Sequence, residues 1–380
     1  MSTISDFLAP DEDDYEDTPQ TVEAEPVQAE NRPPLFGEEG FGKGKSNPRK
    51  GTPRARITER DIPIVYFLGH FPGADVETCS MLSTAKEMTF GTKKVGGGLT
   101  SVATTRTRLD KLRRLGVVDW YRNPLTGDHS YGLTPAGLAS LTSIGLPMSH
   151  GRSLRGLSVS RLPHYRAVAL VAAKFASPAG YFKRVGIDPV PLEKLVSENA
   201  MRAAYEPVKA ELKAEKEAGR SHDFGKWRAE KKAEVMALVT ENKLSRTEIL
   251  DAYPVLLTLG QQQGKGVIAK PVHQPDMVVN LDSDRDEHAK SILIEVERTP
   301  KSHDEYRRIL ATYSAELKSR DIAKRVFYFT LGTQVQTILK KIDADEGYRL
   351  FESGQLTVLP LTDRNGKKLS STARITIGGN

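Results

Sequence analysis

Two acidic segments that read as strands carry the residues best suited to chemistry. The first segment places Asp276 directly after His273-Gln274-Pro275, and the second holds Glu295 and Glu297 within an apolar run. Carboxylates are costly to place in or beside an apolar sheet unless a cation or a positive partner compensates them. If the two strands are neighbours, Asp276 and Glu295 form a site for a hard cation such as Mg²⁺, which serves phosphodiester chemistry. Solvated strand ends are the alternative interpretation.

The single cysteine and the lack of long apolar runs limit the compartment in which the chain works. Cys79 alone excludes an intrachain disulfide and a cysteine zinc cluster, and it fits a reducing environment. No stretch is long and apolar enough to span a membrane, and the first residues lack the basic and apolar regions of a signal peptide. We therefore expect a cytoplasmic protein that has no membrane partner.

Positive charge is concentrated downstream of residue 31. The net charge is +6, although residues 1–31 contain acids but no Lys or Arg. The remainder is therefore considerably more basic than the total, which indicates a polyanionic partner such as nucleic acid. We expect residues 1–55 to be a disordered tail, first acidic and then basic, because they offer few apolar groups to offset chain entropy.

Residues 56–150 have the pattern of a winged helix-turn-helix, which is three helices followed by a β-hairpin. The third helix is basic and carries its apolar stripe through Leu109 and Leu112, at helical spacing. These features predict that the third helix enters the major groove of double-stranded DNA and that the hairpin lies beside it as a wing. The expected helices begin at Asp61 and run over 76–86 and 100–115, and the expected strands are 117–122 and 129–133.

The expected DNA contacts are polar or positively charged and come from the third helix and the hairpin. They are Ser101, Thr104, Arg106, Arg108, Lys111, Arg113, Arg122 and Asn123. Arginine suits guanine or phosphate, and threonine suits phosphate or a thymine methyl group. We expect Arg108 and Lys111 to face solvent, and no cofactor is required for such binding. A basic helix that only promotes solubility, or a winged helix that contacts proteins, is the alternative.

After residue 150 the pattern changes to connecting helices and then to mixed α/β structure. We expect connecting helices over 151–202 and a charged helical insertion over 203–245, which is rich in Ala, Glu and Lys. We expect an α/β domain over 246–365, in which the order from Pro271 is β-β-α-β-α-β, preceded by a helix, and this order suits a mixed sheet with helices on its faces. Residues 366–380 are expected to be a tail. The fold class is therefore multidomain α+β.

Acids in the second domain follow a distinctive order: Glu198 on a helix, Pro275-Asp276 at the head of one strand, and Glu295-Val296-Glu297 on the next. This order resembles the PD-(D/E)XK nuclease-like fold, in whose active members the carboxylates hold Mg²⁺ and a lysine helps to position or activate the attacking water. The resemblance implies Glu198, Asp276 and Glu295 as metal ligands, and Asp276, Glu295 and Glu297 as catalytic candidates. Glu297 stands where the lysine is expected, which weakens the case for catalysis, and Lys301 lies nearer the next helix.

The two halves together carry a second resemblance. The third helix reads Arg106-Thr107-Arg108-Leu109-Asp110-Lys111-Leu112, Gly116-Val117-Val118 follows it, and Tyr306 and Tyr313 follow the acidic strands. This combination is similar to the replication-relaxation family of actinobacterial plasmids, phages and mobile elements, over about residues 58–361 apart from the charged insertion. The resemblance implies DNA binding linked to replication, transfer or regulation of a mobile element, with a degenerate nuclease-like domain. A Mg²⁺-dependent DNA endonuclease and a transcriptional repressor that forms a homodimer stay open as alternatives.

Overall fold

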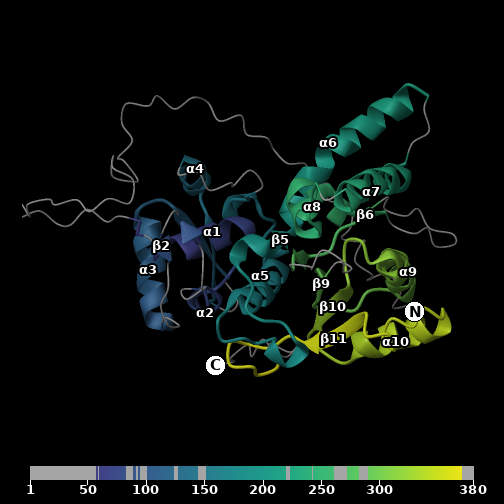
Figure 1. Ribbon diagram of the computed structural model, residues 1–380. Coiled ribbons are helices and arrows are strands. Elements are labelled where there is room, and N and C mark those ends of the chain that lie inside the picture. Colours follow the sequence, from purple (N-terminus) through teal and green to yellow (C-terminus); the bar gives the residue numbers. More distant parts are fainter. Residues whose placement is uncertain are drawn as a thin grey trace, which may run out of the picture. The chain divides into compact units, whose positions relative to one another are not determined.

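Three helices and a hairpin open the part of the chain that the structure describes (Figure 1). The helices are α1 (Ile62–His70), α2 (Val76–Ser80) and α3 (Val102–Arg114), and the hairpin pairs β3 (Val118–Arg122) with β4 (His129–Leu133). Asp61 precedes α1, whose first turn holds a proline, where the missing N–H costs no hydrogen bond. Ser101 caps α3 by accepting a hydrogen bond from the backbone N–H of Thr104. Gly116 follows the helix with a left-handed φ of 72°.

The computed structural model describes residues 57–58, 60–82, 89–90, 93–94, 101–123, 127–143, 151–219, 223–241, 243–260, 272–281 and 290–369. The expected tail over 1–55 and most of the expected tail over 366–380 lie outside these residues. Helix α2 ends earlier than expected, because Met81 and Leu82 form a turn. Two short paired strands, β1 (Thr89–Phe90) and β2 (Lys93–Lys94), separate α2 from α3 in the chain.

A five-stranded mixed sheet has the order β11-β10-β9-β8-β5. Its strands are β5 (Leu195–Ser197), β8 (Met277–Val279), β9 (Ile292–Glu297), β10 (Arg325–Thr330) and β11 (Leu356–Pro360). β9, β10 and β11 are parallel, whereas β8 is antiparallel to both β9 and β5. Helices α9 (His303–Ser319) and α10 (Gln334–Asp345) connect the parallel strands. From β8 onward the order is β-β-α-β-α-β, as expected, whereas β5, which comes earlier in the chain, is a strand that the sequence did not predict.

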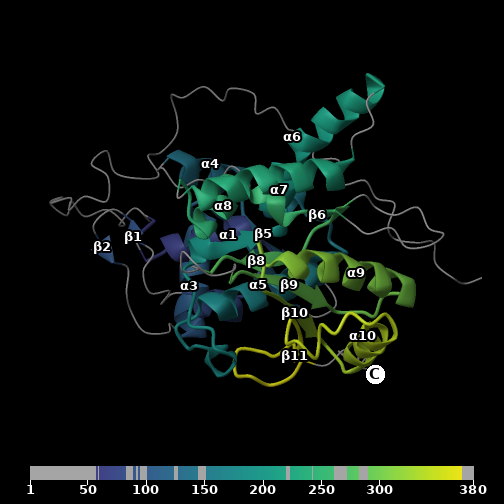
Figure 2. The ribbon, with the colours of Figure 1, turned by 45° about the vertical axis from the view of Figure 1, so that its right-hand side comes forward.

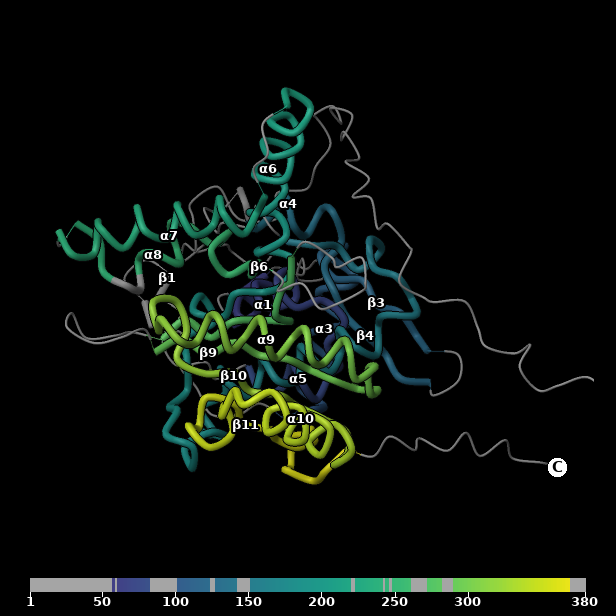
Figure 3. Tube along the Cα trace, turned by 90° about the vertical axis from the view of Figure 1, so that its right-hand side faces the viewer, coloured from purple at the N-terminus to yellow at the C-terminus, as the bar shows by residue number. Residues whose placement is uncertain are grey.

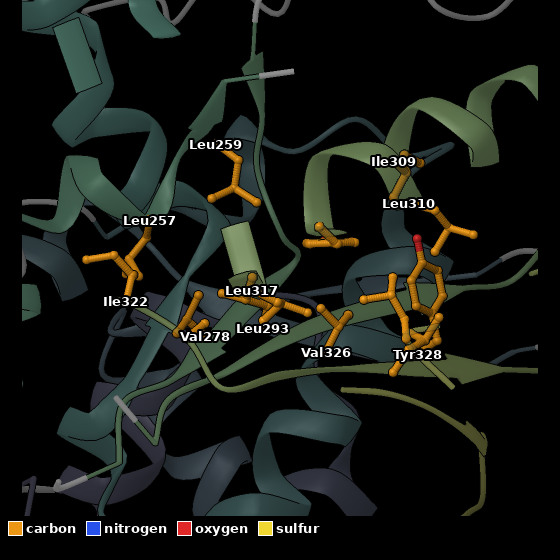
Figure 4. Close-up of a cluster of buried hydrophobic side chains, with 14 of the residues drawn as sticks. Leu257, Leu259, Val278, Leu293, Ile309, Leu310, Leu317, Ile322, Val326 and Tyr328 are labelled. Atoms are coloured by element: carbon orange, nitrogen blue, oxygen red, sulfur yellow. The ribbon is translucent and has the colours of Figure 1, made fainter. Parts of the chain in front are cut away.

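Helices cover both faces of this sheet, so β9 is buried at every position. On one face, Val278 and Leu293 pack against Ile309 and Leu310 of α9 in a large apolar cluster (Figure 4). On the other face lies α5 (Leu162–Ala176), whose Phe175 meets Phe329 of β10 edge to face, with ring centroids 6.3 Å apart. Figures 1 and 2 show α5 and α9 on opposite sides of β9 and β10.

The charged segment after residue 198 forms a helical hairpin. Helix α6 (Glu198–Glu217) is followed by α7 (Phe224–Thr240) and α8 (Arg246–Ala252), with the expected break between α6 and α7. The end of α6 extends away from the sheet (Figure 3). Arg228 ties α7 to α9 through a buried ion pair with Glu316, at 2.7 Å. The insertion is therefore anchored in the body, and its first helix is the one that carries Glu198.

The remaining described elements complete an α+β protein with mixed sheet structure, as expected. They include α4 (Pro135–Ser143), the short pair β6 (Leu259–Gly260) and β7 (Val272–His273), and several short 3-10 helices. None of the helices in the described ranges has the length and apolarity needed to cross a membrane. All described residues fall within one unit, Lys43–Asn380. The finer domain boundaries given above stay predictions.

Candidate nucleic-acid interface and acidic centre

The backbones of three predicted acids lie in register at neighbouring strand ends. The N–H of Glu198 donates to the carbonyl oxygen of Asp276 at 3.2 Å, one residue beyond the pairing of β5 with β8. Met277 of β8 pairs with Ile294 of β9, so Asp276 comes opposite Glu295. The N–H of Val296 donates to Asp276 Oδ2 at 2.6 Å. We call Asp276, Glu295 and Glu297, with Glu198, the acidic centre.

His164, from the first turn of α5, binds the carboxylate of Asp276. Its Nε2 lies 2.9 Å from Asp276 Oδ1. Burial alone would raise the pKa of Asp276, but the His164 charge and hydrogen bond hold this pKa below its usual range. Burial would lower the pKa of His164, but the charge and hydrogen bond of Asp276 raise it above its usual value. Asp276 and His164 therefore form a charged pair that joins β8 to α5.

Glu295 points into the side of the sheet covered by α9. Its Oε1 accepts a hydrogen bond from the hydroxyl of Tyr313 and lies 2.9 Å from His273 Nε2. His273 Nε2 is also 2.9 Å from the Tyr313 oxygen, which closes a three-membered network. Burial, and next the charge of Glu295, raise the pKa of Tyr313, so this phenol stays a hydrogen-bond donor.

Lys301, four residues after the carboxyl end of β9, supplies a positive charge there. Its Nζ lies 3.3 Å from Glu297 Oε2 and 3.6 Å from Glu305 Oε1. Burial raises the pKa of Glu297 to about 7 although Lys301 opposes this shift, and the charge of Glu295 adds to it. Burial would lower the pKa of Lys301, but Glu297, Glu295, Glu305 and Asp276 together raise it. The sequence placed Lys301 nearer the helix, and the structure brings its ammonium to Glu297.

Glu198 has cationic partners of its own. Its Oε1 accepts from Arg202 at 2.7 Å, and its Oε2 lies 3.8 Å from Arg161. A cavity of about 20 Å³, enough for one water, is lined by both Glu198 and Asp276. Among the residues described, no three His, Cys, Asp or Glu side chains are grouped so as to hold a metal ion. The metal set Glu198, Asp276 and Glu295 therefore stays a prediction from the resemblance.

The N-terminal turn of α3 uses its hydroxyl groups for capping. Ser101 Oγ accepts from the N–H of Thr104 at 3.0 Å, and the two hydroxyl oxygens lie 2.8 Å apart. Both residues are exposed. Their side chains thus complete the helix start, and each hydroxyl oxygen keeps a further lone pair for an outside donor.

Arg108 and Lys111 lie on the side of α3 that contacts the start of α1. Arg108 Nε is 3.4 Å from Asp61 Oδ1, and Lys111 Nζ is 3.5 Å from Asp61 Oδ2. The Arg108 side chain is only 16% exposed, whereas that of Lys111 is 33% exposed. The expected solvent-facing position of Arg108 is therefore wrong, because the helix turns it toward a buried carboxylate.

Arg106, Arg113 and Arg122 form the exposed basic surface next to the hairpin, which we call the α3–hairpin surface. The Arg113 guanidinium lies over the Trp120 ring of β3, 5.4 Å from its centroid. Burial lowers the pKa of His129 on β4, and the charges of Arg122 and Arg106 lower it further. The N–H of Asn123 donates to the carbonyl of Asp128 and closes the hairpin turn. This surface brings together the exposed arginines among the predicted DNA contacts.

Three partners of the predicted residues were not predicted from the sequence. His164 is distant in sequence from Asp276, so no local pattern marks the pair. His273 stands three residues before Asp276, and that proximity was an available signal. Asp61 was expected only as a helix start, while the structure also makes it the anion that holds Arg108. Comparison with family models, curated proteins and solved structures finds no match for this chain.

Proposed function

We propose that this protein binds double-stranded DNA through a winged helix formed by α1, α2, α3 and the β3–β4 hairpin. The observation that carries the proposal is the α3–hairpin surface: Arg106 and Arg113 lie exposed on α3, next to the strand that ends in Arg122. Guanidinium groups bind phosphates and guanine edges in a fixed fork geometry. An α-helix beside a hairpin is the element pair that fits a major groove and its flanking backbone.

The acidic centre supports a binding role over catalysis. Asp276 is paired with His164, Glu295 with His273 and Tyr313, and Glu297 with Lys301. Carboxylates already compensated by protein groups have less to gain from a cation. The resemblance noted above implies a role in the replication, transfer or regulation of a mobile element, and we include that role in the proposal.

Fluorescence anisotropy with a labelled duplex tests the DNA-binding proposal. Each lost charge-assisted phosphate contact should weaken binding, so replacing Arg106, Arg113 and Arg122 together by Gln should raise the Kd at least about tenfold. Lys341→Gln, an exposed lysine on α10, is the matched control and should leave the Kd unchanged. Equal affinity of the triple variant and the wild type would overturn the assignment of this surface.

A Mg²⁺-dependent endonuclease is the second candidate, and the register of Glu198, Asp276 and Glu295 favours it. Lys301 adds a cation beside those acids, as a site for phosphodiester chemistry requires. Supercoiled plasmid incubated with Mg²⁺ or Mn²⁺ separates the two candidates. Nicking that Asp276→Asn abolishes and the exposed Asp345→Asn does not would establish the enzyme. Plasmid that stays intact with both metals would exclude the endonuclease and support a protein that only binds DNA.

A further inference from the structure

A pocket of about 440 Å³ lies between α2, α3, β4 and α5, which we call the α3–β4 pocket. Its volume falls in the range of small-molecule sites, whose walls combine aromatic side chains with a few polar groups. The pocket is separate from the acidic centre, because none of the four acids lines it. The charges and rings of its walls define the chemistry of a ligand.

Two arginines give the pocket its positive edge. Arg106 and Arg113 lie seven residues apart on α3, both exposed, and both line the pocket. Neither forms an ion pair with another residue in the described part of the chain. Guanidinium groups that form no direct ion pair at a concave site favour an anion, and phosphate matches their fork geometry.

Carboxylates also line the pocket: Asp110 lies on α3 between the two arginines, and the others lie at the start of α2 and in the hairpin turn. They make a simple anion a poorer ligand than an anion that also carries hydrogen-bond donors. Asp75 and Asp128 are already held by Arg166, at 2.6 Å and 3.0 Å. Asp110 and Glu77 also line the pocket and form no ion pair with another described residue. They would repel a bare phosphate but accept hydrogen bonds from ring N–H or amino groups, as acidic side chains do from the cytosine amino group.

Aromatic side chains form the third part of the wall. Trp120, His129 and Tyr131 line the pocket, and the Trp120 and His129 ring centroids are 4.0 Å apart, edge to face. His129 Nε2 is buried and has no hydrogen-bond partner among the described residues. A buried polar atom without a partner is costly, and a polar edge of a ligand would satisfy it.

We propose that the α3–β4 pocket binds a nucleoside monophosphate, either free or as an unpaired nucleotide of a nucleic acid strand. Arg106 and Arg113 take the phosphate, Asp110 or Glu77 accepts from the base edge, and the aromatic wall contacts the base. This ligand carries both an anion and hydrogen-bond donors, which matches the mixed charge of the walls. The proposal stands without duplex binding, because a single nucleotide satisfies every group named.

Trp120 fluorescence tests the proposal in a Trp227→Phe background, which removes the other tryptophan. Titration with GMP, CMP, AMP and UMP should give a saturable change for at least one nucleotide with an amino group. Arg106→Gln should weaken that Kd about tenfold, which is about 1.4 kcal/mol. Arg114 is exposed on the same helix and does not line the pocket, so Arg114→Gln should leave the Kd unchanged. Asp110→Asn should alter the preference among bases.

Other outcomes would overturn the proposal. An equal response to inorganic phosphate or ribose 5-phosphate would show an anion site without base recognition. No response to any mononucleotide up to about 10 mM, a concentration that detects very weak binding, would show that the pocket binds none. If binding is seen, competition by a single-stranded oligonucleotide assigns the pocket to a strand nucleotide. Absence of competition assigns it to a free nucleotide, and both results keep the proposed ligand class.

Discussion

The guanidinium of Arg108 lies 3.4 Å from the buried carboxylate of Asp61, so a basic residue of α3 is directed into the protein. Asp61 also accepts hydrogen bonds from the N–H and hydroxyl of Thr58, at 2.8 Å and 2.7 Å. The Asp61 side chain is 2% exposed, and Lys111 is its second cation. This carboxylate therefore fixes α3 against the start of α1.

Asp61→Ala should destabilise the protein by on the order of 2–3 kcal/mol, because it removes several hydrogen bonds to a charged group and leaves two cations without their partner. Arg108→Gln should cost less, about 1 kcal/mol, since Lys111 still compensates Asp61. Urea unfolding of each variant measures the loss. The exposed Arg114→Gln serves as a control for removing charge from the same helix. An unchanged midpoint for Asp61→Ala would contradict the role of this pair.

Asp276→Asn should lower the pKa of His164, because the carboxylate is what raises it. The raised His164 pKa gives stability that is fully present below its ordinary 6.5 and is lost as pH rises through the raised value. The lowered Asp276 pKa gives stability present above its ordinary 3.8 and lost as pH falls through the lowered value. The stability difference between wild type and variant should therefore be largest between about pH 4 and 6.5.

NMR titration of the imidazole signals measures this change, and the exposed His303 provides an internal control in the same spectra. A His164 titration that is identical in both proteins would show that the 2.9 Å contact carries no charge interaction in solution.

Glu297→Gln should change how stability depends on pH. The folded protein holds this carboxyl proton up to about 7, against 4.5 ordinarily, so the contribution of Glu297 is present below about 4.5 and declines as pH rises through 7. The free energy of unfolding of the variant, relative to that of the wild type, should therefore rise between about pH 4.5 and 7 and stay constant above pH 7. Urea unfolding at several pH values measures the difference. A difference that is flat from pH 4.5 to 8 would contradict the raised pKa, and exposed Glu352→Gln is the matched control.

Local features of the fold were predictable because they depend on neighbours in the chain. Strand β9 was expected from a run of apolar residues that Glu295 interrupts, and the helix that follows it begins after Ser302, which accepts a hydrogen bond from the N–H of Glu305. Strand β5 was not predictable, since three residues carry no periodicity and their strand character comes from pairing with β8.

The candidate sites were also predictable only in their local features. Spacing placed Asp276 and Glu295 on neighbouring strands, but their partners come from distant helices: His164 from α5 and Tyr313 from α9. Helical spacing left two polar sides of α3 equivalent, and only the position of α1 decides that Arg108 turns inward while Arg106 stays exposed. Tertiary packing determines which side of α3 is buried, and a single sequence does not reveal that packing.

The salt dependence of duplex binding tests the central claim most directly. Each phosphate contact that is lost should reduce the slope of log K against log salt concentration by about 0.9. Binding of a labelled duplex, measured at several salt concentrations, should show a smaller slope for Arg106→Gln and for Arg113→Gln than for the wild type. Lys341→Gln should keep the wild-type slope. Duplex binding with the same slope in all four proteins, or no salt-dependent binding at all, would contradict DNA recognition by the α3–hairpin surface.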